Sequence, residues 1–196
     1  MLELCAECGS ATLTERVTPF EVSSGNKSDI IEDRQTFCST CGNISYAGDQ
    51  VSRHELAVAA KVRELDGLLS AEDLRRIRLK YGFRQADLEA MLSVGPKTWT
   101  RWERGKVPQS KAADTLIRVL AEDPEVARRL MEQAGIDNPA AAAIFADIDE
   151  NARRLAAASL RAEIGDGMTR VDIGRMAARA VDAVREARHG TGVRVA

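Results

Sequence analysis

The chain has 196 residues, of which 44% are hydrophobic and 30% charged, so it can bury a core and stay soluble. Aromatic residues make up only 4%, and alanine is abundant in the last third, which favours helices over a β-sandwich or barrel. No apolar run approaches the ~18 to 20 residues of a membrane span, and the N-terminus lacks the basic and apolar regions of a signal peptide. We therefore expect a cytoplasmic protein with no membrane partner.

The net charge of -2 conceals an uneven distribution along the chain. Residues 1–50 carry 3 basic and 8 acidic side chains, whereas residues 51–120 carry 14 basic and 9 acidic ones. A basic middle segment between acidic flanks suggests that this segment meets an anionic partner. The excess is small, and a solvated basic face is the alternative interpretation.

All four cysteines lie in two matched CxxC-Gly motifs, Cys5 with Cys8 and Cys38 with Cys41. Each motif can present two thiolates to one ion, and the trailing glycine accepts the backbone bend. The spacing predicts one structural zinc ion per chain, since four cysteines leave no open coordination position. A rubredoxin-like iron site, a redox pair and disulfides are the alternatives; disulfides are disfavoured in a reducing compartment.

The segment between the two motifs predicts a β-hairpin. Residues 12–22 and 29–37 carry apolar residues among polar ones, and residues 23–28 form a polar turn. About fifty residues hold few large apolar side chains, so the metal is expected to supply much of the folding free energy. The N-terminal region is therefore predicted to be a small zinc ribbon.

Five helices are predicted next, in chain order. Residues 51–65 form a connecting helix, and Ser70 opens a second one with Leu74, Ile77 and Tyr81 on its apolar stripe. Short helices follow at 84–92, at 96–104 with Pro96 as first helical residue, and at 110–121. Short helices separated by a tight turn are typical of a helix-turn-helix domain.

The predicted helix 96–104 is the candidate recognition helix. Trp99 and Trp102 share one face and are expected in the core, which leaves its basic and hydroxyl side chains free to meet a groove of DNA. Lys97 in the first turn and Arg101 one turn later would lie on one face, and both side chains favour guanine. The predicted DNA contacts are Gln85, Lys97, Thr98, Thr100, Arg101, Arg104 and Lys106.

Residues 85–88, 92–94 and 99–105 resemble the lambda-repressor-like (XRE) family without gaps. That family places Gln at the start of the second helix, here Gln85, and a glycine after the recognition helix, here Gly105. This chain departs from the pattern at Arg84, where Thr is usual, and at Gly95, where Ser usually caps the recognition helix.

The order of motifs over residues 1–133 resembles the MqsA (YgiT) type of antitoxin. The resemblance implies that the N-terminal zinc domain contacts a toxin, while the C-terminal domain dimerises and represses its own operon at a palindromic site on double-stranded DNA. The zinc ligands carry over to the four cysteines, and the base-reading Arg falls on Arg101. The family's base-reading Asn falls on Lys97, so a preference for guanine in place of adenine is expected at that position.

The last third of the chain lies outside this resemblance. Helices are predicted over residues 123–134 and 139–164, the latter with Ile144, Ile148 and Leu155 on a stripe. A further helix is predicted to open at Thr169, with Ile173, Ala177, Val181 and Val184 facing inward. These Ala-rich helices could dock on the helix-turn-helix, pair between subunits or bind another protein.

The predicted fold is mainly α, with an N-terminal zinc-ribbon β-hairpin (1–50), a linker helix (51–67), an XRE-type helix-turn-helix domain (68–134) and an Ala-rich helical extension (135–196). We expect a homodimeric, sequence-specific repressor, the antitoxin of a type II toxin–antitoxin pair. The alternatives are a regulator without a toxin and a zinc-ribbon adaptor that binds protein. No enzyme is expected, because neither His54 nor His189 has sequence neighbours that suggest a catalytic nucleophile, and the sequence has no phosphate-binding loop.

Overall fold

The computed structural model describes residues 4–163, 175 and 178–184. The chain divides into two compact units. One, called here the ribbon unit, comprises Met1–Ala71 and Arg101–Gln109; the other, the helical unit, comprises Glu72–Thr100 and Ser110–Ala196. The short segment 101–109 therefore belongs with the N-terminal cysteines, although the chain first leaves that unit at residue 71.

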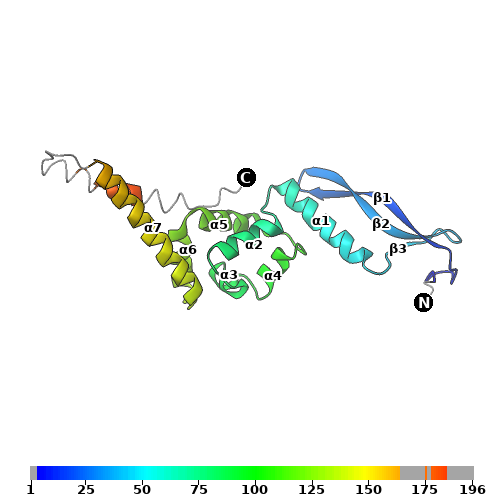
Figure 1. Ribbon diagram of the computed structural model, residues 1–196. Helices are drawn as coiled ribbons and strands as arrows, with labels where there is room; N and C mark the ends of the chain where they lie inside the picture. Colours follow the sequence, from blue (N-terminus) through cyan, green and yellow to red (C-terminus); the bar gives the residue numbers. More distant parts are fainter. Residues whose placement is uncertain (1–3, 164–174, 176–177, 185–196) are drawn as a thin grey trace. The chain divides into compact units, whose positions relative to one another are not determined.

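A long β-hairpin forms the centre of the ribbon unit (Figure 1). Strand β1 (Leu13–Ser24) pairs antiparallel with β2 (Lys27–Cys38), and β2 also pairs with the two-residue strand β3 (Ile44–Ser45). Gly25 supplies a φ of 60° at the first turn position, where tight hairpin turns require a positive value. Because the turn is this tight, the strands run further into residues 23–28 than the sequence predicts.

Helix α1 (Gln50–Asp66) lies along the hairpin and packs against both long strands (Figure 1). The Thr36 hydroxyl on β2 donates to the buried side chain of Gln50 at 2.9 Å. The helix ends at Gly67, whose left-handed φ of 65° lets its amide bond the last helical carbonyls. The connecting helix predicted at 51–65 is thus present, and the β-ribbon and α1 fold as one body.

The helical unit is built from α2 (Ala71–Lys80), α3 (Gln85–Met91), α5 (Lys111–Glu122), α6 (Pro124–Gln133) and α7 (Pro139–Glu163). Helix α4 (Thr98–Glu103) begins in this unit, and the boundary between the units falls inside it. Each helix overlaps one predicted from periodicity. The almost fully buried side chains of this unit include Leu74, Ile77, Tyr81, Phe83, Leu88, Trp99, Ile117 and Leu120.

The first turns of α7 pack inside the helical unit. Phe145 is 3% exposed and stacks on Tyr81 with ring centroids 5.6 Å apart. The stripe predicted for this helix is right only in part: Ile144 and Ile148 are half-buried, but Leu155 is 58% exposed. The fully buried positions among the described side chains of α7 are Ala141, Phe145, Ala152 and Ala156. Small residues there allow close helix approach, and one aromatic ring fills the remaining space.

Part of the predicted C-terminal helix lies outside the described residues, including Thr169, Ile173 and Ala177. Residues 178–184 are helical, but Val181 is 69% exposed, so its predicted inward orientation is wrong. Over the ranges that the structure describes, no helix combines the length and apolar character needed to cross a bilayer.

Candidate metal centre and predicted DNA-binding segment

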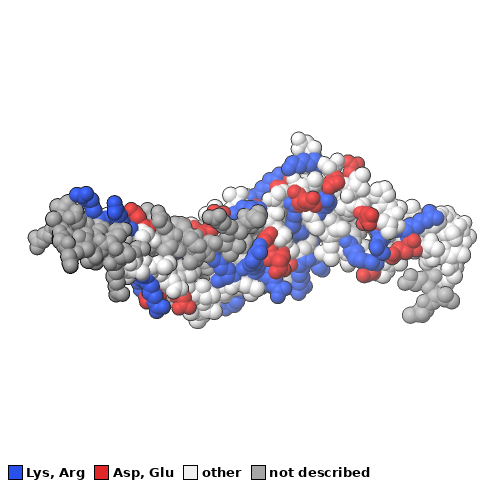
Figure 2. Space-filling view, turned by 45° about the horizontal axis from the view of Figure 1, so that its top comes forward, with Lys and Arg blue, Asp and Glu red and all other residues white. Residues whose placement is uncertain are grey.

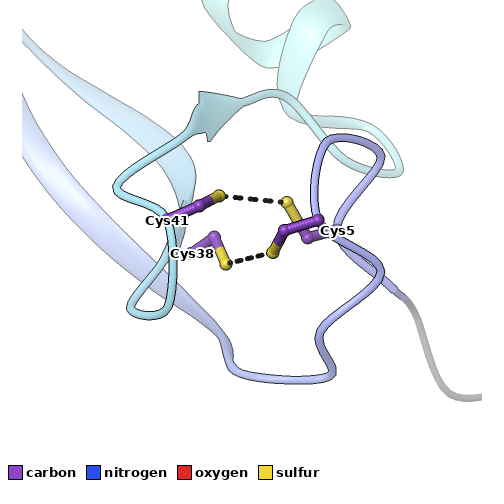
Figure 3. A group of neighbouring side chains, drawn as sticks. Cys5, Cys38 and Cys41 are labelled. Carbon is purple, nitrogen blue, oxygen red and sulfur yellow. Dashed lines mark hydrogen bonds between the residues drawn. The ribbon is translucent and has the colours of Figure 1, made fainter.

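The four cysteines converge at the base of the ribbon. Their sulfur atoms all lie within 4.8 Å of one another. The Sγ atoms of Cys5 and Cys41 are 3.7 Å apart, and those of Cys8 and Cys38 are 3.6 Å apart (Figure 3). Four sulfurs at the Zn–S distance of about 2.3 Å around a tetrahedral ion would be about 3.8 Å apart. The geometry therefore fits one ion bound by four thiolates, and all four cysteines are free of disulfides.

Both CxxC motifs adopt the same local backbone. The amide of Gly9 donates to the carbonyl of Cys5 at 2.8 Å, and the amide of Gly42 donates to that of Cys38 at the same distance. The φ values of the two glycines are 69° and 77°, in the region that a side chain disfavours. The sequence repeat CxxC-Gly thus encodes two equivalent turns, which explains why the spacing predicts the site.

Hydroxyl groups link the two turns next to the sulfurs. Ser10, Thr12 and Thr40 form a closed set of side-chain hydrogen bonds of 2.7 to 3.0 Å. The Thr12 hydroxyl also lies 3.8 Å from the Cys38 sulfur. Main-chain hydrogen bonds, first from the amide of Cys41, lower the pKa of Cys38 to about 6. Those amides favour the thiolate form of Cys38, which is the form that binds a metal ion. The Asn43 amide lowers the pKa of Cys41, but the neighbouring thiols together raise it above the usual value.

The predicted recognition helix begins later in the structure than the sequence predicts. Helix α4 begins at Thr98, not at Pro96, and Lys97 has a left-handed φ of 62°. Lys97 therefore precedes the helix, and its expected place one helical turn before Arg101 is wrong. The physical cause is a cap from the preceding helix: the Glu89 carboxylate accepts the amide of Trp99 at 3.0 Å.

The other predicted contacts lie on α3, on α4 or just beyond it. The Thr100 hydroxyl donates to the side-chain oxygen of Gln85 at 2.7 Å, which ties α4 to the start of α3. The tryptophans are buried as expected, at 0% and 5% exposure. The charged candidates Lys97, Arg101, Arg104 and Lys106 are exposed, and Gln85, Thr98 and Thr100 are half-buried.

The start of α3 is held by residues that sequence reasoning missed. Arg84 and Asp87 form a capping pair, with the Arg84 amide donating to the carboxylate at 2.8 Å. Asn138, at the start of α7, donates to the same carboxylate at 2.7 Å. The sequence carries one usable signal, because Asn138 precedes Pro139 as a helix N-cap precedes a proline at the first helical position.

Charge alone does not mark a binding face. Figure 2 shows basic side chains interrupted by acidic ones over the face drawn. Several basic side chains of the described residues are paired, as Arg53 is with Asp49 at 2.9 Å and Arg118 with Asp114 at 2.7 Å. The case for DNA binding therefore depends on where the unpaired basic groups of the α4 region lie, not on total charge.

The chain thus combines a β-ribbon, which ends in a four-cysteine cluster able to hold a metal ion, with a bundle of short helices. This combination defines a mainly α-helical protein with a small N-terminal metal-binding ribbon. The chain belongs to the MqsA antitoxin family, since the model of the antitoxin component of the bacterial toxin–antitoxin system MqsA matches residues 3–131. The resemblance found in the sequence is thereby confirmed, and membership implies a toxin partner. No curated protein matches the chain. Helix α7 lies beyond the matched residues.

Proposed function

We propose that this antitoxin is a sequence-specific DNA-binding repressor that binds its own promoter as a homodimer. The observation that carries the proposal is the arrangement of α3 and α4. The Gln85–Thr100 hydrogen bond and the buried Trp99 fix one side of α4, while Arg101, Arg104 and Lys106 remain exposed at its end. Exposed guanidinium groups on such a helix suit guanine edges and phosphates.

The role that we propose for each side chain in DNA recognition follows from its position relative to α4. Arg101 is the proposed base-reading residue because it lies within α4. Lys106 follows the helix and is the proposed phosphate contact. Lys97 stays among the proposed contacts, together with Gln85, Thr98, Thr100 and Arg104, but its position before the helix removes the basis for a shared face with Arg101. A dimer would match a palindrome with half-sites about one turn, ~34 Å, apart.

The experiment is a titration of the full-length protein against duplex DNA from its own upstream region and against a scrambled duplex, at several salt concentrations. Arg101→Ala should cost ~1–3 kcal/mol on the specific duplex and little on the scrambled one. Lys106→Ala should weaken both about equally and reduce the salt slope by about 1. Arg129→Ala, which alters an exposed arginine on α6, is the matched control. Equal binding of both duplexes by every variant would refute sequence-specific recognition.

We infer that the metal is zinc and that it is structural. Four thiolates in a tetrahedral arrangement favour zinc or iron, and a closed four-sulfur shell leaves no position for a substrate. Bound there, the ion would clamp the two CxxC turns together and hold the base of the hairpin. Elemental analysis of the purified protein separates the two metals.

We propose that the ribbon unit binds the toxin. One face of the hairpin carries Val17, Glu21, Ile30 and Glu32, which the register places on the same side. Val17 and Ile30 are 49% and 63% exposed, so they add apolar surface beside the exposed carboxylates of Glu21 and Glu32. This mixture of apolar and acidic groups fits a basic partner, and electrostatic attraction would speed association.

The test is co-purification with the product of the neighbouring reading frame. A Glu21→Lys, Glu32→Lys variant should slow association and remove much of its salt dependence. Glu150→Lys, on the exposed side of α7, is the control. Unchanged association by the ribbon variant would place the toxin elsewhere on the chain.

A further inference from the structure

The buried Arg63 of α1 binds the backbone that follows the predicted recognition helix. Its side chain is 5% exposed, and its guanidinium donates to the carbonyl of Gly105 at 3.1 Å and of Trp102 at 3.4 Å. A further hydrogen bond reaches the carbonyl of Val107. Burial lowers the pKa of Arg63, and no carboxylate is among its hydrogen-bond partners in the described part of the chain. Three main-chain oxygens, one from the last turn of α4 and two from the loop that follows it, thus converge on one buried cation.

This loop carries or adjoins the proposed DNA contacts. Gly105 ends α4 with a φ of 73°, and the amide of Lys106 donates to the carbonyl of Arg101 at 3.0 Å. The Arg63 hydrogen bonds hold the carbonyls on either side of Lys106, because Gly105 and Val107 are its chain neighbours. The backbone that presents Lys106 is therefore fixed from α1 and not only by α4.

A groove of about 440 Å³ separates α1 from this loop. Val58 and Val62 line its α1 side, and Arg101 and Lys106 line the other. The Arg63 guanidinium, fixed beside these residues, sets the spacing between α1 and the end of α4. A Lys side chain is a poor replacement, because its three donors radiate from a single nitrogen, whereas the two terminal nitrogens of the guanidinium reach separate carbonyls.

The same half of α1 is held by the tip of the β-hairpin. The Ser24 hydroxyl donates to the Asp66 carboxylate at 2.9 Å, and the Lys27 ammonium donates to the carbonyl of Leu65 at 2.7 Å. Lys61 pairs with Asp29 at 2.9 Å. These contacts lie within one turn of Arg63, so a displacement of the hairpin tip would move the guanidinium as well.

We propose that Arg63 is a positioning residue for DNA recognition, which links the β-ribbon through α1 to the end of α4 and the Lys106 loop. This inference rests on the proposed DNA binding. It makes the ribbon unit part of the DNA-reading apparatus, so that a partner bound to the ribbon can change DNA affinity without touching DNA. Because ligand coupling is reciprocal, DNA would change the affinity for that partner by the same factor.

The experiment compares full-length wild type, Arg63→Met and Arg63→Lys in two measurements. Compared with wild type, Arg63→Met should bind the specific duplex about 5- to 100-fold more weakly, and the scrambled duplex should lose less affinity. Amide hydrogen exchange should become faster at residues 104–107 and stay unchanged in α5 and α6. Arg63→Lys should rescue little. Arg53→Met, at an exposed site on the same helix, should match wild type.

A double-mutant cycle tests the link to the ribbon. Ser24→Ala combined with Lys27→Ala should weaken specific binding in wild type and have no further effect beside Arg63→Met. Full additivity would overturn the link, and unchanged specific affinity in Arg63→Met would overturn the positioning role. If wild type itself binds no DNA, the proposed function fails; hydrogen exchange at residues 104–107 then still decides whether Arg63 holds the loop.

Discussion

Replacing Asn138 with Ala should destabilise the helical unit, although this residue lies beyond the segment that matches the antitoxin family. Its side chain is 6% exposed and makes three hydrogen bonds. It donates to Asp87 at 2.7 Å and to the carbonyl of Gly82 at 3.1 Å, and it accepts the amide of Ala141 at 3.1 Å. One side chain therefore caps α7 and supports the start of α3.

The magnitude follows from the chemistry of these bonds. A hydrogen bond to a buried carboxylate contributes about 1.5–3 kcal/mol, and an N-cap contributes about 1 kcal/mol. Arg84, which pairs with Asp87 at 2.8 Å, is not altered by the substitution, so we expect the carboxylate to keep a partner. We therefore expect a loss of about 2–4 kcal/mol in the free energy of unfolding, the lower part of this range if water enters the site.

Asn138→Asp separates the two contributions. It retains the capping oxygen but places a second carboxylate beside Asp87, so at pH 7 it should cost at least as much as Asn138→Ala. The loss should shrink as the pH falls toward about 4, because one of the two carboxyl groups then takes up a proton.

The assay is urea unfolding of the full-length variants, followed by tryptophan fluorescence, because Trp99 is fully buried in this unit. Asn151→Ala, at an exposed asparagine of the same helix, is the control and should stay within about 0.5 kcal/mol of wild type. An Asn138→Ala midpoint equal to that of the control would refute the reasoning, since α7 would then not be held at its start.

Three further predictions concern the metal, the α7 contact and acid stability. The purified protein should contain one zinc per chain, and strong chelation should unfold the β-ribbon while amide hydrogen exchange in α5 and α6 stays slow; iron, or two disulfides, would contradict this. Phe145→Ala should cost ~3–5 kcal/mol in urea unfolding because it leaves a cavity beside Tyr81, whereas Leu155→Ala, at a 58% exposed site, should cost under ~1 kcal/mol; equal losses would mean that Phe145 is not in the core. Burial opposes ionisation of Asp87, but its hydrogen bonds, first those from Arg84, hold its pKa below the usual value. The contribution of Asp87 to stability is therefore present above about pH 4 and is lost as the pH falls below it. Asp87→Asn should reduce the loss of unfolding free energy between about pH 5 and pH 3. The same pH dependence in wild type and variant would show that Asp87 does not contribute.

Local sequence signals were sufficient for most of the secondary structure and for the cysteine cluster. Two CxxC-Gly motifs encode two equivalent turns, because the glycine takes the positive φ and the short spacing points both sulfurs the same way. Helices with a regular apolar stripe were equally predictable, as α2 shows with Leu74 and Ile77 at 0% exposure. These features depend on residues a few positions apart, which the sequence displays directly.

The predictions that failed are those in which a distant group decides a local conformation. Lys97 was expected in a helix, yet α4 begins only at Thr98, where Glu89 of α3 accepts the amide of Trp99. Lys97 therefore precedes the helix and has a left-handed backbone. The stripe of α7 was assigned to branched residues, yet Tyr81 selects Phe145 as the buried position. Sequence periodicity describes one helix at a time and carries no information about the partner that covers it.

The amino-acid sequence alone determined the class of metal ligand, the order of the helices and membership of the antitoxin family, because each is written in short-range residue spacing. Only the tertiary structure decided that Arg63 joins α1 to the end of α4, 39 residues away, and that Asn138 supports α3, 51 residues away. Nothing in the sequence marks Arg63 as buried, and the place of Asn138 before Pro139 indicates a helix cap but not its contact with α3. Their roles arise because folding removes water from their surroundings, so that buried carbonyl and carboxylate oxygens must find donors wherever the chain brings them.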